Sequence, residues 1–154
     1  MVNHAGGISV ITFIVAVAVS MGYYQFVYIP QANAKPTLPE EVLKPPQTIQ
    51  VKIAQGASLP TNGQFFVPKE VHANLGVSNK VVWTNTDITA HSVTSDNGYV
   101  DKISGDFNSI QQLGSLIMPG KTFEFTFTKV GDYPYHCEPH PHMKGVVSIA
   151  QQKF

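Results

Sequence analysis

The sequence predicts an all-β domain, an antiparallel β-sandwich of about seven or eight short strands, preceded by one N-terminal apolar helix. Three observations predict this fold class. Apolar and polar residues alternate with period two in several short runs after Thr48, which is typical of half-buried strands. Turn sequences such as TNG, SDNG and MPGK separate those runs. The N-terminus carries a long apolar stretch without a charged side chain.

This N-terminal stretch has the length of a membrane-spanning helix. No Asp, Glu, Lys or Arg occurs from Ala5 to Ala34, and the apolar run covers residues 8–29. As a helix, this run would be about 33 Å long, close to the thickness of the hydrocarbon core of a bilayer. Residues 1–29 are therefore predicted to form a transmembrane anchor, with membrane contact through residues 8–29.

A cleaved signal peptide is the competing interpretation of the same segment. The sequence ANA, which ends at Ala34, resembles a small-residue cleavage site. The anchor is preferred because the residues before the apolar run include no Lys or Arg, and because the run is long for a signal peptide. Both interpretations place the rest of the chain on the extracytoplasmic side, in the periplasm or outside the cell.

Residues 30–47 are predicted to be a linker. Five of these eighteen residues are proline, and they show no hydrophobic periodicity. Such a composition favours stiff polyproline II structure, which could reach about 55 Å when fully extended. If the anchor is retained, this linker would hold a domain away from the bilayer surface.

Residues 48–154 are predicted to form the β-sandwich as one domain. The clearest alternation is in residues 121–129, where Phe123, Phe125 and Phe127 face one side and polar residues face the other. Trp83 lies in a similar run and is expected in the same core. The runs that carry the pattern are residues 48–54, 80–85, 121–129, 132–137 and 145–150.

Composition excludes some classes of function. Ten basic residues balance ten acidic ones, so a nucleic-acid partner, which selects for a basic face, is not expected. The only cysteine is Cys137, which rules out an intramolecular disulfide and a four-cysteine zinc site. Cys137 can therefore be a buried thiol without a chemical role, a nucleophile or a metal ligand.

Side chains that bind soft metals are concentrated in one stretch near the C-terminus, YHCEPHPHMKG. It holds the cysteine, three of the six histidines and one of the four methionines, and its spacing is Cys-x-x-His-x-x-Met over Cys137, His140 and Met143. Two prolines favour a tight, non-helical loop that can turn several side chains toward one point. A thiolate, an imidazole and a thioether together suit a soft or borderline metal.

One more histidine would complete a blue copper site, in which two His and one Cys form a trigonal set with a weak axial Met. His91 is the candidate, because it follows a predicted strand and could reach the same end of the sandwich. Spacing alone leaves open whether His140 or His142 supplies the second imidazole.

The motifs GDYPYHCEPHPHMKGVV, WTNTDITAHSV and MPGKTFEFTF resemble the plastocyanin and azurin family of cupredoxins over about residues 64–150. The short ligand loop is most similar to that of amicyanin and departs from plastocyanin, whose loop has more residues before the methionine. The resemblance implies a Greek-key β-sandwich with one copper ion, Cu(I) or Cu(II), per chain. By position it implies a ligand set of His91, Cys137, His140 and Met143.

The resemblance also assigns residues around the ligands. It leaves His142 as a rim residue, together with Pro139 and Pro141, around the exposed edge of His140. His136 takes the place of a surface tyrosine that serves plastocyanin as a remote electron port, so it is a candidate port here.

A closed shell of four ligands leaves no open position for a substrate, which favours an electron carrier over an enzyme. We expect electron transfer between membrane-associated redox proteins of a respiratory or similar electron-transport chain, with no small-molecule substrate. The alternatives are a copper-containing subunit of a membrane oxidoreductase and, less favoured, a copper storage or delivery protein. A multicopper oxidase or copper nitrite reductase is disfavoured, because Cys137 is flanked by His136 and Glu138 and few histidines remain for a second copper centre.

Overall fold

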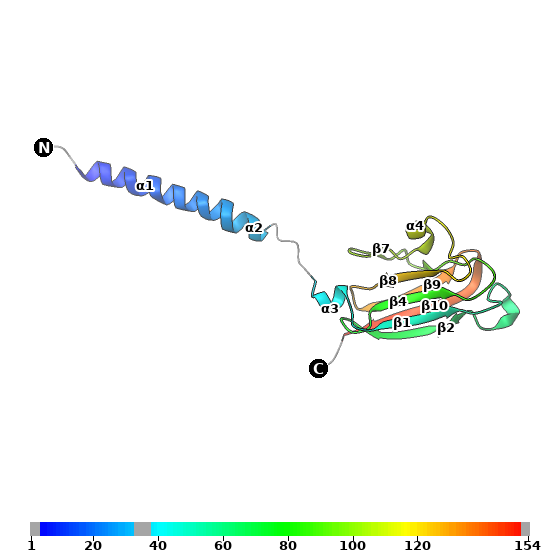
Figure 1. The fold of residues 1–154 in the computed structure, drawn as a ribbon. Coiled ribbons are helices and arrows are strands. Elements are labelled where there is room, and N and C mark those ends of the chain that lie inside the picture. The colour runs from blue at the N-terminus through cyan, green and yellow to red at the C-terminus, as the bar shows by residue number, and fades with distance from the viewer. Residues whose placement is uncertain (1–3, 33–37, 152–154) are drawn as a thin grey trace. The chain divides into compact units, whose positions relative to one another are not determined.

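The computed structural model describes residues 4–32 and 38–151, and the chain divides into two compact units between Thr37 and Leu38. The first unit is helical: α1 (His4–Tyr23) continues into a π-helical turn, η1 (Tyr24–Tyr28), and α2 (Ile29–Ala32). Figure 1 shows these elements as the blue ribbon.

This helical unit contains a stretch, Val10–Tyr28, that is long and apolar enough to cross a membrane. A signal sequence near an N-terminus passes the same test. The predicted helix is thus present, whereas its insertion in a membrane stays a prediction. The predicted cleavage after Ala34 lies outside the described residues.

The predicted extent of the linker, residues 30–47, is wrong at both ends: residues 30–32 belong to α2, and the C-terminal part is partly helical. There the chain forms a short helix, α3 (Glu40–Leu43), that begins after Pro39. Val42 in this helix is buried, and its carbonyl accepts a hydrogen bond of 2.8 Å from the Asn79 side chain. The proline-rich composition gives no helical pattern here. The helix packs on the domain through a single buried side chain, that of Val42, and through the hydrogen bond from Asn79.

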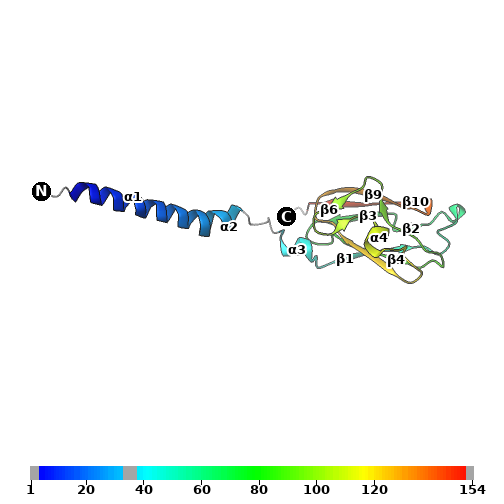
Figure 2. The same cartoon turned by 90° about the horizontal axis from the view of Figure 1, so that it is seen from above.

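The second unit is a β-sandwich of two four-stranded sheets, as predicted. The strand order of the first sheet is β2 (Phe66–Val67), β1 (Thr48–Ile53), β4 (Lys80–Asn85) and β8 (Thr122–Thr126). The strand order of the second sheet is β3 (Glu70–Asn74), β10 (His140–Ala150), β9 (Gly131–Cys137) and β5 (Thr94–Ser95). Figure 2 shows the two sheets as separate layers.

The remaining elements are short and lie in the connections between strands of the sandwich. They are η2 (Pro60–Asn62), the hairpin of β6 (Val100–Asp101) and β7 (Gly105–Asp106), and α4 (Ser109–Leu113).

The sheets are mixed rather than wholly antiparallel, which corrects the prediction. β1 runs parallel to β4, and β3 runs parallel to β10. After β1 and β2 the chain crosses to the other sheet as β3 and then returns as β4 beside β1. A crossover of this kind brings two strands side by side in the same direction, and such crossovers are typical of Greek-key connections.

Aromatic side chains fill the space between the sheets. Trp83, Phe123, Phe125 and Phe127 are all at most 2% exposed, as expected from the alternation in β4 and β8. Tyr135 from the opposite sheet meets the Trp83 ring edge to face at 5.5 Å between centroids. This core gives the loops at the ends of the strands a rigid base.

Candidate metal centre

Three of the predicted ligands lie together at one end of the sandwich. Cys137 ends β9, His140 begins β10, and His91 lies in the loop after β4. The sulfur of Cys137 is 3.7 Å from Nδ1 of His91 and 3.6 Å from Nδ1 of His140. All three ligand atoms lie within 4.8 Å of one another. Residues far apart in the sequence therefore converge on one small volume.

The tight turn between β9 and β10 sets the position of two of these side chains. Cys137 and His140 are cross-strand partners at the closed end of the hairpin. The pairing then shifts register between His140 and Lys144. Such an irregularity re-aims side chains next to functional sites. Met143 lies within this irregular stretch and is fully buried.

His91 is held in place by its backbone. It exchanges two backbone hydrogen bonds with Ile117, of 3.2 and 2.8 Å. The buried side-chain amide of Asn85 donates to the carbonyls of Thr89 and Ile117, at 2.8 Å each. The Asn85 side chain thereby joins the loop that carries Thr89 and His91 to the segment that carries Ile117.

Asp87 fixes the orientation of the His91 ring. Its carboxylate lies 2.8 Å from Nε2 of His91, and both side chains are fully buried. Because an ionised carboxylate only accepts hydrogen bonds, Nε2 carries the proton, which leaves the Nδ1 lone pair facing Cys137. The backbone N–H groups of Gly56 and Ile88 and the hydroxyl of Thr89 also donate to this carboxylate.

These hydrogen bonds determine the charge of Asp87. Burial by itself raises the pKa of its carboxyl, but the hydrogen bonds from Gly56, His91, Ile88 and Thr89 outweigh burial and hold that pKa well below its usual range. Asp87 is therefore ionised at neutral pH. It places one negative charge behind the candidate ligand His91.

The sulfur of Cys137 accepts a backbone hydrogen bond. The N–H of Ser92 donates to it at 3.3 Å, and the Ser92 hydroxyl accepts from the N–H of Glu138 at 2.8 Å. Burial raises the pKa of the Cys137 thiol, and the bond from Ser92 opposes that shift. Hydrogen bonding at the cysteine sulfur is one of the features that tune the potential of a blue copper site.

The side chains present fit a copper ion. A metal ion would have a metal–sulfur bond of about 2.3 Å and a metal–nitrogen bond of about 2.05 Å. If the sulfur–metal–nitrogen angle lies between the tetrahedral and the trigonal value, the sulfur and the nitrogen should be about 3.6 to 3.8 Å apart. The two sulfur–nitrogen distances, 3.7 and 3.6 Å, agree with this spacing. Burial, with smaller contributions from the neighbouring imidazoles of His91 and His142, lowers the pKa of His140, so its imidazole is neutral at pH 7, as a ligand must be.

The predicted rim residues lie at the surface of the same end. Pro139 and Pro141 are exposed, and His140 and His142 are partly exposed. The structure places His140, and not His142, beside the sulfur. Nε2 of His142 instead donates to the carbonyl of Ala57 at 3.1 Å.

His136 lies apart from this rim. It precedes Cys137 on β9, is partly exposed, and forms a hydrogen-bonded pair with the carboxylate of Asp96. Its side chain therefore points away from the buried sulfur, as strand alternation predicts.

Sequence reasoning missed three features of the site. The role of Asp87 is the first, because the sequence shows only an acidic residue four positions before His91. Ser92 gave no signal, because it acts through its backbone. The third is a pair of exposed apolar residues, Ile88 and Met118, in the loops that hold His91.

Comparison with known proteins agrees with this site. The family described as copper binding proteins, plastocyanin/azurin family, matches residues 50–150. Amicyanin of Paracoccus denitrificans is 30% identical over 80 residues, which is 52% of this chain and 54% of that protein. Amicyanin-alpha of Methylorubrum extorquens is 30% identical over 105 residues, 68% of this chain and 74% of that protein.

A solved structure shares the fold. The structure entitled "Novel Purple Cupredoxin from Nitrosopumilus maritimus" matches with a TM-score of 0.53 and 31% identity, over 66% of this chain and 99% of that one. The buried His–Cys–His cluster and these matches lead to one conclusion: the chain belongs to the plastocyanin/azurin family of copper-binding cupredoxins, with copper as its cofactor.

Proposed function

We propose that this chain carries single electrons between redox proteins through one type 1 copper ion held by His91, Cys137, His140 and Met143. The observation that carries the proposal is the buried cluster of one sulfur and two imidazole nitrogens at metal-ligand spacing. When bound, the copper supplies a one-electron couple, Cu(II)/Cu(I). All four side chains come from this chain, and three of them are fully buried.

The residues around the cluster keep its geometry constant. Asp87 fixes the His91 ring, Ser92 donates to the sulfur, and Asn85 joins the two loops. Ligands that cannot rearrange keep the two oxidation states close in structure, which lowers the reorganisation that electron transfer requires. A rigid, water-excluding site with a full ligand set suits a carrier rather than a catalyst.

Electrons should enter and leave through His140. It is the one ligand of the four that is partly exposed. The exposed side chains of Ile88, Met118 and the two rim prolines give this end of the domain an apolar surface. Because the net formal charge is zero, docking should depend on this surface more than on long-range steering.

We further propose that the domain works outside the cytoplasm, tethered by α1. The support is an apolar N-terminal helix of spanning length. N-terminal sequencing of the mature protein tests this point. A first residue at Lys35, in protein from the soluble fraction, would show that the helix is a removed signal peptide.

Visible and EPR spectra of the copper-loaded chain test the central proposal. The oxidised protein should be intensely coloured by sulfur-to-copper charge transfer, and Cys137→Ser should remove the colour. His142→Ala is the matched control and should leave the spectrum nearly unchanged. A colourless protein with an ordinary tetragonal Cu(II) signal would overturn the assignment.

A second experiment separates the two candidate ports. Pro141→Glu places a charge on the rim without touching a ligand, so it should slow electron exchange with the native partner and leave the colour unchanged. His136→Leu alters the remote position. If His136→Leu slows exchange and Pro141→Glu does not, electrons pass through the β9 side instead.

A further inference from the structure

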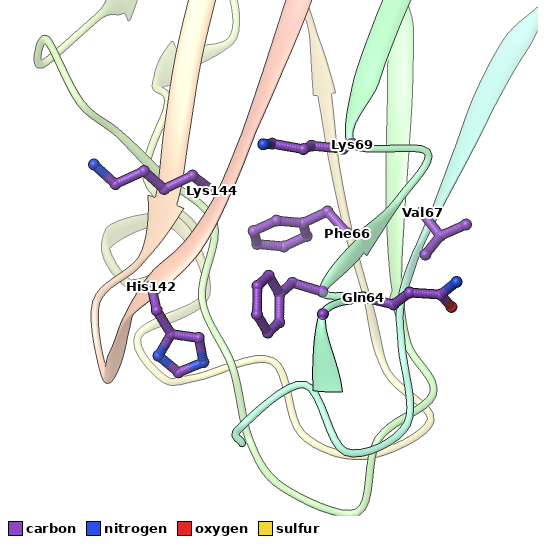
Figure 3. A pocket seen from close by; sticks show the side chains of 8 residues that line it. Gln64, Phe66, Val67, Lys69, His142 and Lys144 are labelled. Carbon is purple, nitrogen blue, oxygen red and sulfur yellow. The ribbon is translucent and has the colours of Figure 1, made fainter. Parts of the chain in front are cut away.

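A pocket of about 330 Å³ lies beside the candidate copper loop. Its walls come from the chain around β2 and from the first half of β10, and Figure 3 shows it from close by. The residues that line it are Gly63, Gln64, Phe65, Phe66, Val67, Lys69, His142 and Lys144. The function proposed above uses none of these except His142 as a rim residue.

Aromatic rings form a preformed wall of this pocket. The rings of Phe65 and His142 meet edge to face, with centroids 4.9 Å apart and an interplanar angle of 71°. The hydrogen bond from His142 to the Ala57 carbonyl holds the imidazole in that position. Phe66 is 2% exposed and packs on Tyr135 of the core. Phe65 and His142 therefore offer a fixed aromatic surface, and the buried Phe66 lies behind it.

Positive charge lines the same pocket. Lys69 and Lys144 are both exposed, and neither forms an ion pair within residues 38–151, where the four pairs found involve other side chains. In Figure 3, Lys69 extends past Phe66 toward β10, whereas Lys144 extends from β10 away from Phe66, and Val67 points away from the pocket. Two ammonium groups without acidic partners favour an anion and disfavour a cation.

We propose that this pocket binds a small aromatic carboxylate. Its volume lies at the lower end of the range for small-molecule sites, about 300 to 1,000 Å³, which suits a single ring with a short acidic group. Edge-to-face and offset contacts with the aromatic wall would hold the ring. A charge-assisted hydrogen bond from Lys69 would hold the carboxylate, and Lys144 would add positive charge at the edge of the pocket.

The position of the pocket gives this binding a consequence at the metal centre. The ring centroids of His142 and His140 are 6.0 Å apart. A ligand against His142 therefore lies next to the exposed copper ligand. The binding itself needs no metal, so it stands independently of the electron-transfer proposal.

Calorimetric titration of the full chain in a zwitterionic detergent, with benzoate as the probe, tests the proposal. Benzoate should bind saturably, and proton NMR should show shifts at the rings of Phe65, Phe66 and His142. The neutral isostere benzamide should bind at least about tenfold more weakly, because it lacks the charge that the lysines recognise.

Charge-matched variants identify the groups responsible. Lys69→Gln with Lys144→Gln should weaken benzoate binding by at least about tenfold, the loss expected for charge-assisted bonds. Lys102→Gln removes the same charge from an exposed lysine outside the pocket and should leave binding unchanged. Equal binding of benzoate and benzamide, equal effects of the pocket and control lysines, or no saturable binding in the millimolar range would each overturn the proposal. A colourless copper-loaded protein would leave these results unaffected and would count only against the electron carrier.

Discussion

Replacing Asp87 by Asn should raise the reduction potential of the copper site. The Asp87 carboxylate is 2.8 Å from Nε2 of His91. A metal bound to Nδ1 would be about 2.0 Å from Nδ1, on the opposite side of the imidazole ring from Asp87. The negative charge of Asp87 would then be roughly 7 Å from the copper. This charge favours Cu(II) over Cu(I), and Asn removes it without changing the shape of the side chain.

The size of the effect follows from Coulomb's law. Two unit charges roughly 7 Å apart interact by about 2.4 kcal/mol at an effective dielectric constant of 20. For a one-electron couple, about 1.4 kcal/mol corresponds to 59 mV, so the potential should rise by roughly 100 mV. Loss of a partner that orients a ligand should also weaken copper binding by about 10- to 100-fold.

A redox titration that follows the visible band of the full chain measures this shift. Asp132→Asn is the control, because it removes the same charge from an exposed residue near Gly131, at the opposite end of β9 from Cys137. If both variants shift the potential equally, or if Asp87→Asn lowers it, the electrostatic reasoning is wrong. Urea unfolding checks that Asp87→Asn remains folded despite the weakened bonds to the Gly56 and Ile88 N–H groups.

Three further predictions address the proposed axial ligand, the packing and the acid stability. Met143→Leu conserves volume and should cost less than about 1.5 kcal/mol of unfolding free energy, while spectra and potentiometry should show retained copper and a higher potential. Gly145→Ala would place a Cβ 2.5 Å from the Tyr135 ring, so urea unfolding should show a loss of about 1 to 3 kcal/mol, and an unchanged midpoint would contradict this. Burial raises the pKa of Asp101, but hydrogen bonds, among them two from Thr128, outweigh burial and lower it. The ionised Asp101 therefore contributes its full stabilisation above the unfolded pKa of about 3.9, and this contribution is lost as pH falls through the lower folded pKa. In Asp101→Asn, the free energy of unfolding should depend less on pH below about 4.

The sequence predicted the sandwich because alternation in β4 and β8 marks which side chains are buried. It could not predict which neighbours are parallel, since the period of two is the same for both directions. The spacing around Cys137 left His140 and His142 open as the second imidazole, and the family resemblance assigned His140, which the tight turn places beside the sulfur. The role of Asp87 could not be predicted, since its contact with His91 depends on how an irregular loop folds.

The turn between β9 and β10 has a consequence for metal uptake by the unfolded chain. Three of the four proposed ligands lie within seven residues, Cys137 to Met143, so they stay near one another even without tertiary structure. An unfolded chain should therefore be able to bind copper with this segment before His91 joins the site. Because binding to the unfolded state offsets part of the stabilisation that a bound metal provides, copper should raise the melting temperature by less than its affinity for the folded domain implies.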